Sequence, residues 1–245
     1  MTALSKETAN ALTIYIDAQG NYLDVLARND VFLNEKNYTV EDKMEILKKE
    51  VNINGNKELL YITKDGEGIS TSGIKFSAID KEFFKTAIKG SIFMSEPMIS
   101  YTNNSSVVIV IAAPVKDKNG EITGVVTAVR NASVLRDFVN EMSFGRTGYV
   151  SVFDRKGVAV ANKDMSLVKN FVNVFEKKSR KDPKLKELSQ LFNGMIPGKV
   201  GSGIYKENGE VKYTAYSPVK GTNWVLSVTK SERTGDEYKR DCRKA

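Results

Sequence analysis

The sequence predicts an α+β fold made of two similar units, each an antiparallel sheet flanked by helices, arranged along one long N-terminal helix. Three observations lead to this prediction. A helical stripe of apolar residues opens the chain, and short apolar strands separated by glycine-containing turns follow it. The order of elements in the first half is then repeated in the second half. Strands and helices in this mixed order are typical of antiparallel sheets covered by helices.

The leading helix is predicted over residues 4–28. This segment contains no proline, and apolar residues recur at helical spacing through Leu12, Ile16 and Leu23, although Gly20 weakens the pattern. The apolar stripe can pack entirely on the two sheets, or it can meet the same stripe of a second copy. A homodimer through this helix is therefore one of two alternatives.

A second helix is predicted across residues 39–51, with Thr39 as its N-cap. Acidic residues early in this segment precede Lys48 and Lys49, an order that suits the helix dipole. The hydrophobic period then changes to that of strands, so the first sheet is expected to begin after this helix.

The first repeat is predicted to be a strand pair, a short helix and a hairpin. The strand pair turns at Asp65–Gly66, and the short helix is expected to start at Asp80 and to stop at Gly90. The hairpin is expected to turn at Asn119–Gly120, because these two residues tolerate the positive φ of a tight turn.

The second repeat follows a linking helix predicted at residues 133–144. "GYVSVFDRKGVAVANKD" (residues 148–164) repeats the strand pair, and "DPKLKELSQLFNG" (residues 182–194) repeats the capped short helix. A region with its own turn at Asn208–Gly209 repeats the hairpin, and both hairpin regions contain the sequence Pro-Val-Lys. We therefore expect a duplicated module.

The composition excludes several classes of enzyme. The chain has 245 residues, one cysteine (Cys242) and no histidine, which removes Ser-His-Asp triads, Cys-His pairs and cysteine-based zinc sites. No phosphate-binding glycine loop, calcium loop or dinucleotide fingerprint is present. We expect no catalysis, no cofactor and no metal. A hydrolase or transferase that works through carboxylates is the alternative interpretation.

The net charge of +7 does not indicate a nucleic-acid-binding protein. The basic runs at residues 176–188 and 236–245 lack the interleaved aromatic residues of a single-strand binding surface. They are expected to form a solvated helix face and a tail, or to lie near an anionic membrane surface. No stretch has the length of a membrane helix, and the N-terminus lacks the order of a signal peptide.

Four stretches of the chain resemble the landmarks of double-Cache sensor domains. They are "EFFKTAIKG", "APVKDKNGEITGVV", "FGRTGYVSVFDRKGVAVANKD" and "YSPVKGTNWVLSVTKSE". Their order and spacing resemble that family from the leading helix to about residue 232. The resemblance implies a long helix at residues 1–29, a membrane-distal PAS-like module at 30–135, a membrane-proximal PAS-like module at 136–232, and at 233–245 a tail or the start of a helix that returns to the membrane.

The resemblance implies the extracytoplasmic sensing domain of a bacterial receptor at the cell membrane, anchored by membrane helices outside this sequence. Its partner would be a small molecule rather than nucleic acid. A methyl-accepting chemotaxis protein is the leading interpretation, and the sensor domain of a histidine kinase or of a cyclic-di-nucleotide enzyme is the alternative. A non-sensory module that binds protein is a further alternative.

The resemblance also implies a ligand site in the distal module. In many members that bind amino acids, cationic and aromatic side chains hold the carboxylate of the ligand, and two aspartates hold its ammonium. The corresponding residues here are Lys81, Phe83, Phe84, Met98, Ser100 and Val129, and Tyr101 adjoins Ser100. Both acidic positions are lost, and a buried ammonium without a counter-ion costs several kcal/mol. This pocket is therefore not expected to bind a free α-amino acid.

One cation, Lys81, remains among apolar side chains, which suits a small carboxylate with an apolar body. Lysine is a compact point charge and orients a carboxylate less than arginine does. In the alternative interpretation Lys81 faces solvent on a capped helix and the phenylalanines are ordinary core. The loop at residues 95–106 is expected to become ordered around the ligand, and the leading helix is expected to transmit a shift of about 1–2 Å.

The proximal module contains further polar candidates. They are Tyr149, Asp154, Asn162, Tyr205, Tyr213 and Tyr216. A second binding site among them is an alternative to structural roles, of which a core aromatic for Tyr149 and a turn carboxylate for Asp154 are expected.

Overall fold

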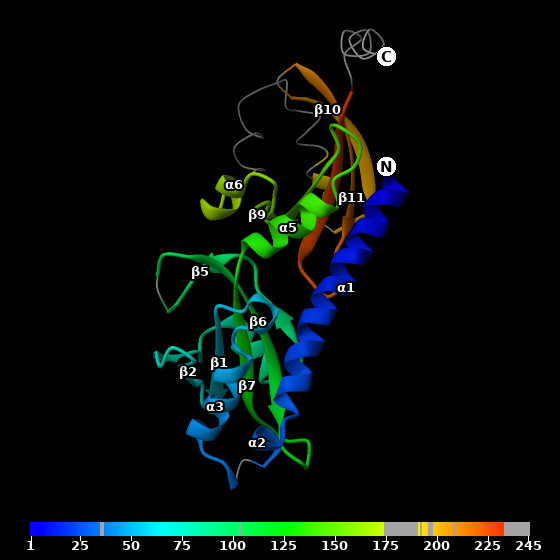
Figure 1. The fold of residues 1–245 in the computed structure, drawn as a ribbon. Helices are drawn as coiled ribbons and strands as arrows, with labels where there is room; N and C mark the ends of the chain where they lie inside the picture. The colour runs from blue at the N-terminus through cyan, green and yellow to red at the C-terminus, as the bar shows by residue number, and fades with distance from the viewer. Residues whose placement is uncertain are drawn as a thin grey trace, which may run out of the picture. The chain divides into compact units, whose positions relative to one another are not determined.

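The computed structural model describes residues 1–34, 37–102, 104–173, 191, 193–195, 198–207 and 209–232, apart from the side chains of Asn54 and Glu207. The chain divides into two compact units. The first unit consists of residues 14–134, and the second unit consists of residues 1–13 and 135–245. Helix α1 (Thr2–Ala27) contributes residues to both (Figure 1).

Helix α1 confirms the predicted leading helix, and its apolar stripe is buried within the chain. Leu12 and Leu23 are 1% and 0% exposed, whereas Ile14 and Val25 on the opposite face are 60% and 69% exposed. The stripe is thus used for packing inside the chain. At Gly20 an added Cβ would lie 2.5 Å from Cγ2 of Ile92. The glycine that weakens the helix therefore allows α1 and Ile92 to approach each other closely.

The sheet of the first unit has the strand order β3-β2-β1-β7-β6-β4, with β5 pairing with β6. All of its pairings are antiparallel. Its strands are β1 (Glu58–Thr63), β2 (Glu67–Ser70), β3 (Lys75–Ser77), β4 (Phe93–Met94), β5 (Met98–Ile99), β6 (Val107–Lys116) and β7 (Ile122–Asn131). Its helices are α2 (Asp30–Leu33), α3 (Val40–Glu50), the short 3-10 helix η2 (Ile53–Gly55) and α4 (Glu82–Ala87).

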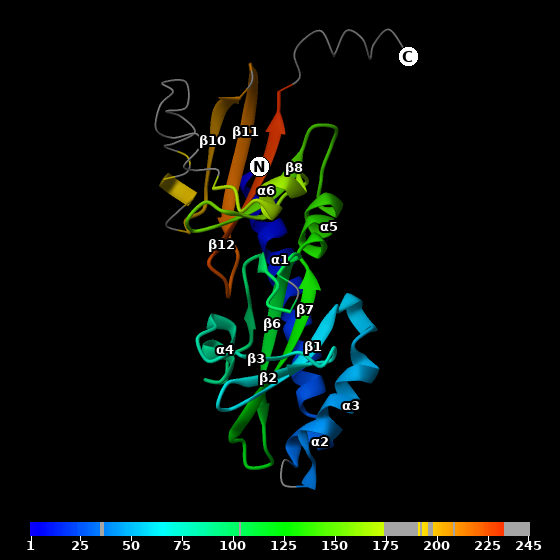
Figure 2. The same ribbon diagram turned by 90° about the vertical axis from the view of Figure 1, so that its left-hand side faces the viewer.

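The two faces of this sheet are covered by different helices. Side chains alternate between faces along a strand, so Val125 and Val129 of β7 pack with Phe83 of α4. Arg130 points to the other face and donates a hydrogen bond to Gln19 of α1. Figure 2 shows α4 on the near side of the sheet and α1 behind it. Strand β7 is therefore in contact with α4 on one side and with α1 on the other.

The predicted start of the second helix is confirmed in detail. Thr39 caps α3 with its hydroxyl, which accepts from the backbone N–H of Asp42. The Asp42 carboxylate accepts in return from the backbone N–H of Thr39 at 2.7 Å. This reciprocal pair is a capping box.

Two local predictions in the first unit are wrong. Lys81, rather than Asp80, occupies the N-cap position of helix α4, and no side-chain hydrogen bond is made there. In the β6–β7 hairpin only Gly120 has a positive φ. Asp117 Oδ1 accepts from the backbone N–H groups of Asn119 and Glu121, so a longer loop built on an aspartate replaces the two-residue turn.

The second unit has a five-stranded antiparallel sheet in the order β10-β11-β12-β8-β9. Its strands are β8 (Tyr149–Asp154), β9 (Ala159–Ala161), β10 (Gly201–Glu207), β11 (Glu210–Pro218) and β12 (Trp224–Ser231), and its helices are α5 (Ser133–Glu141) and α6 (Met165–Lys169). Helices α5 and α6 lie on one side of this sheet (Figure 1). On the other side the hydroxyl of Ser5 in α1 is 2.9 Å from that of Ser217.

Several predictions for the second half fall outside the described residues. The turn residue Asn208, the basic run at residues 176–188 and the segment 233–245 are outside, and so is most of the helix predicted at 182–194. None of the helices in the described part of the chain has the length and hydropathy needed to cross a membrane.

Candidate ligand-binding cavity

A small apolar cavity lies between helix α4 and the sheet of the first unit. Its volume is about 20 Å³, which is enough for one water molecule. The cavity is lined by Leu60, Phe76, Phe83, Ser100, Tyr101, Thr102, Val108, Val110, Thr127 and Val129. Strands β1, β6 and β7 form its floor, and α4 and the segment after β5 cover it.

One hydroxyl group on the floor of the cavity has no hydrogen-bond partner among the described residues. Thr127 is fully buried, and its Oγ1 makes no hydrogen bond within the described part of the chain. A buried polar group left in this state costs about 1–3 kcal/mol. A molecule in the cavity that bonds to this oxygen would recover that free energy.

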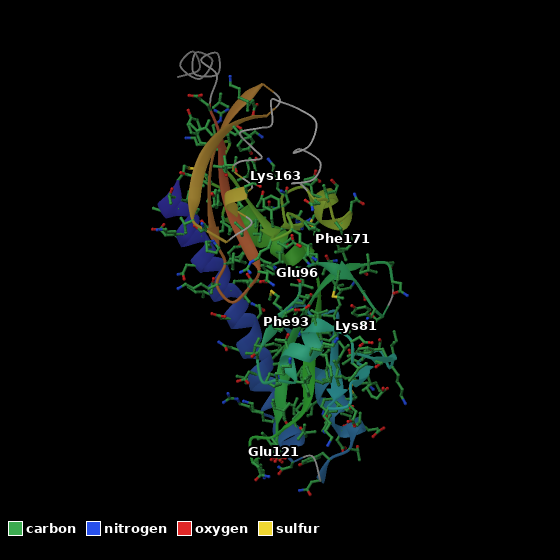
Figure 3. The ribbon with its side chains drawn as sticks, turned by 180° about the vertical axis from the view of Figure 1, so that it is seen from behind. Lys81, Phe93, Glu96, Glu121, Lys163 and Phe171 are labelled. Atoms are coloured by element: carbon green, nitrogen blue, oxygen red, sulfur yellow. The ribbon has the colours of Figure 1, made fainter. Side chains whose placement is uncertain are left out.

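Lys81 lies at the rim of the cavity. Its Nζ is 4.2 Å from the centroid of the Tyr101 ring, a cation–π contact. The Tyr101 ring in turn is 6.5 Å from the ring of Phe83 and is 41% exposed. No carboxylate of the described residues forms an ion pair with Lys81. Figure 3 labels Lys81 at the start of α4.

The segment after β5 covers one side of the cavity and is held by its own hydrogen bonds. The hydroxyls of Ser100 and Thr102 are 2.9 Å apart, and the Ser100 N–H donates to the Ser106 carbonyl. Ser95, before β5, accepts from the Val110 N–H through its hydroxyl at 2.9 Å. Hydrogen bonds therefore hold Ser95 before β5 and Ser100 after it.

The residues predicted for the site are distributed between the cavity and its surroundings. Phe83, Ser100, Tyr101 and Val129 line the cavity, and Lys81 contacts one of them. Phe84 and Met98 pack in the surrounding hydrophobic cluster without lining the cavity.

Six lining residues were not predicted from the sequence: Leu60, Phe76, Thr102, Val108, Val110 and Thr127. Thr127 could have been predicted from the sequence, because it lies two residues before Val129 on the same strand and therefore on the same face.

The chemistry of the lining restricts what can bind. No acidic side chain is among the lining residues, so a buried ammonium group would have no counter-ion here. Metal binding is not indicated either, because the described residues contain no group of three or more His, Cys, Asp and Glu side chains with suitable geometry. The cavity offers apolar contact, the Thr127 hydroxyl, which has no partner among the described residues, and one cation at the rim.

Comparisons with known proteins extend this description. A family model described as a Cache domain (dCache_1) matches residues 1–234. The chain is similar to the ligand-binding domain of the Pseudomonas fluorescens chemoreceptor CtaA in complex with L-serine, with 16% identity, a TM-score of 0.70 and 94% of each chain covered. No curated protein sequence matched.

Two further solved structures are similar. The ligand-binding domain of the Pseudomonas aeruginosa PAO1 amino acid chemoreceptor PctB in complex with L-Arg has 16% identity and a TM-score of 0.69, and 96% of this chain and 94% of that chain are covered. The extracellular domain of the proposed histidine kinase rpHK1S-Z16 has 18% identity and a TM-score of 0.67, with 95% and 93% covered. These likenesses confirm the predicted α+β fold of two PAS-like modules on a long helix.

Proposed function

Because the chain belongs to the Cache domain family, we propose that it is the extracytoplasmic ligand-sensing domain of a bacterial transmembrane receptor. In this proposal residues 30–135 form the membrane-distal module, and residues 136–232 form the membrane-proximal module. Membrane segments outside this sequence anchor the domain. The role is sensory rather than catalytic.

The receptor type that we favour is a methyl-accepting chemotaxis protein. Its support is that the similar CtaA and PctB domains belong to chemoreceptors. The similarity to the extracellular domain of a proposed histidine kinase supports the alternative of a kinase sensor. A homodimer in either receptor would use the exposed face of α1 that carries Ile14 and Val25, because the opposite stripe is buried.

The observation that carries the proposal is the apolar cavity with one unsatisfied hydroxyl. We propose a small carboxylate with an apolar body and no amino group as its ligand. The body would lie against Phe83 and Val129, an oxygen of the ligand would bond to Thr127, and a carboxylate would reach Lys81. Phe84 and Met98 support this site from the adjoining cluster, while Ser100 and Tyr101 cover it.

Ligand entry requires the cavity to open, because about 20 Å³ is far below the volume of a site for a small organic molecule. The Tyr101 ring and the segment around Ser100 are the parts that can move, since Tyr101 is partly exposed. A ligand that stabilises the open arrangement shifts the equilibrium between two conformations, which is the physical requirement for a sensor.

Strand β7 provides the route from this cavity to α1. Thr127 and Val129 face the cavity, whereas Arg130 is on the opposite face and is 3% exposed. Its guanidinium donates hydrogen bonds to Asn56, which follows η2, and to Gln19 of α1. Burial lowers the pKa of the Arg130 guanidinium, and Tyr15 of α1 opposes this effect. A displacement of β7 would therefore move α1, and a coupling free energy of about 1–3 kcal/mol would be sufficient for signalling.

A thermal-shift experiment tests the proposal. Short monocarboxylic acids with apolar chains, each paired with its α-amino analogue, are titrated against the protein. We expect the acids to raise the Tm and the amino analogues to have no effect. Lys81→Ala should abolish the response to the acids, and Lys89→Ala, in the same region but outside the cavity, should preserve it. Equal or larger shifts with the amino analogues would refute the proposed ligand class.

A further inference from the structure

The second unit repeats the sheet of the first unit with a different chemistry on the equivalent face. The strand order β2-β1-β7-β6 corresponds to β9-β8-β12-β11. The registers can be aligned through the two prolines of the repeated Pro-Val-Lys sequence. Pro114 pairs with Val125, and Pro218 pairs with Val225.

This alignment identifies the counterparts of four residues that line the cavity of the first unit. Leu60, Val110, Thr127 and Val129 correspond to Ser151, Thr214, Ser227 and Thr229, respectively. These four counterparts are all at most 4% exposed. The first unit thus has one hydroxyl at these positions, and the second unit has four.

The hydroxyl-bearing face is an unfavourable surface for an apolar ligand. Its groups are hydrogen-bonded to one another, for example Thr214 to Thr229 at 2.9 Å, and Asn162 donates to Ser151 at 3.0 Å. An apolar molecule placed on this face would separate such groups without replacing their hydrogen bonds, which is costly. A ligand of the second unit should therefore be polar.

A groove of about 310 Å³ lies at the end of this face, where strand β8 begins. Helix α5, the loop between α5 and β8, the first residues of β8 and Lys163 form its walls. Polar side chains in these walls include those of Asn140, Ser143 and Arg146, and Tyr149 contributes its ring. The volume lies within the range of small-molecule sites.

Positive charge is concentrated around the ring of Tyr149. Lys163 Nζ is 4.8 Å and Lys212 Nζ is 5.7 Å from the ring centroid, and Arg146 lines the same groove. Among the described residues, no carboxylate lines the groove, and none forms an ion pair with Lys163, which Figure 3 labels. Positive charge on these side chains attracts an anion that enters the groove.

We propose that this groove is a second ligand site, which binds a small oxyanion carrying two negative charges, such as a dicarboxylate or a phosphate. Arg146 and Lys163, the two cations that line the groove, come from different segments of the chain, so they can contact different oxygens of one ligand. A monocarboxylate with an apolar body does not fit, because it would supply one charge and no further acceptors. The site is separate from the cavity of the first unit and does not depend on it.

Isothermal titration calorimetry of the 245-residue chain tests this proposal. Malonate and inorganic phosphate are the divalent probes, and acetate is the monovalent comparison, at one ionic strength maintained with sodium chloride. We expect at least one divalent probe to bind with a Kd at least tenfold lower than that of acetate. Lys163→Gln should weaken the binding at least fivefold, and Arg146→Gln should weaken it as well.

Two control variants locate the site. Lys169→Gln removes an exposed lysine of α6 that does not line the groove, and Thr127→Val changes the cavity of the first unit. Both variants should bind the divalent probe as the unchanged chain does. Divalent binding no tighter than that of acetate, or binding unaffected by Lys163→Gln, would overturn the proposal. Loss of binding in Thr127→Val would assign the anion to the first unit instead.

Discussion

At the scale of single residues, Thr127 is the feature that makes the cavity differ from an ordinary apolar core. Its neighbours on the same strand face, Val125 and Val129, are apolar, and all three are buried. Only Thr127 contributes a polar atom there, and that atom has no partner among the described residues. A hydroxyl that lowers stability in this position is consistent with selection for a ligand contact.

Replacing Thr127 by Val separates stability from binding. The shape is nearly kept and the unsatisfied hydroxyl is removed, so the free energy of unfolding without ligand should rise by about 1–3 kcal/mol. The response to carboxylic acids in the thermal-shift experiment should fall at the same time. Urea denaturation provides the stability measurement.

Thr214→Val is the matched control, because the Thr214 hydroxyl is hydrogen-bonded to the Val228 carbonyl and to Thr229. This variant should lose about 1 kcal/mol of stability. If Thr127→Val were destabilised to the same extent, the Thr127 hydroxyl would have to be satisfied in the unliganded protein.

At the scale of elements, helix α3 is stabilised by a capping box that depends on pH. Hydrogen bonds from the backbone N–H and the hydroxyl of Thr39 lower the pKa of Asp42 below its ordinary value of 3.8. Because the pKa is lower in the folded state, this stabilisation is complete above the unfolded pKa and is lost as the pH falls through the folded pKa.

Asp42→Asn should therefore lower the Tm at pH 7 and have little effect in acid. The difference in Tm between the variant and the unchanged chain should shrink below about pH 4, because the carboxyl of the unchanged chain is then becoming protonated. Thermal unfolding followed by circular dichroism from pH 7 to pH 3 measures this difference. A difference that stays constant over that range would exclude the carboxylate as its origin.

The contact of α1 with Ile92 in the first unit can be tested through Gly20. Alanine at this position favours the helix by about 1 kcal/mol, but its Cβ would approach Ile92 to 2.5 Å. We expect Gly20→Ala to change the free energy of unfolding little, because the two effects oppose each other.

In an Ile92→Ala background the clash is absent, and Gly20→Ala should then stabilise the protein by about 1 kcal/mol. Urea denaturation of the two single variants and the double variant forms the cycle. Equal effects of Gly20→Ala in both backgrounds would show that α1 and Ile92 do not meet.

At the scale of the whole molecule, two sheets with the same order of four strands carry different side chains on the equivalent face. The two units share their strand order and the pairing of a proline with a valine. They differ in the residues on the equivalent face, which is apolar in the first unit and bears hydroxyl groups in the second. In the two proposals above, two units of one plan would bind two classes of molecule.

Hydrogen exchange should separate the two proposed sites. An apolar monocarboxylate is expected to protect backbone amides of residues 95–102 and of strand β7, and malonate is expected to protect residues 143–150. Mass spectrometry of peptic fragments measures both effects on the same chain. Protection of the same segments by both ligands would contradict the assignment of one site to each unit.

Local sequence patterns were sufficient to predict the helices and strands discussed next and their repetition. The apolar period of α1, the cap at Thr39 and the two Pro-Val-Lys stretches each depend on residues within a few positions of one another, so they can be recognised before the chain folds. The start of α4 and the loop at Asp117 could not be predicted in the same way. Helix α4 begins without a side-chain capping hydrogen bond, so no local signal marks its N-cap. In the hairpin, the Asp117 side chain binds backbone N–H groups of the turn.

Tertiary structure decided which side chains meet at the two proposed ligand sites. The cavity joins Leu60, Phe83 and Thr127, which are far apart in the chain, and their meeting depends on strand register, which no single segment specifies. The same is true of Lys163 and Lys212 around Tyr149. Spacing along the chain sets which helices and strands form, whereas the pairing of distant strands sets which side chains share a face and therefore what the molecule can bind.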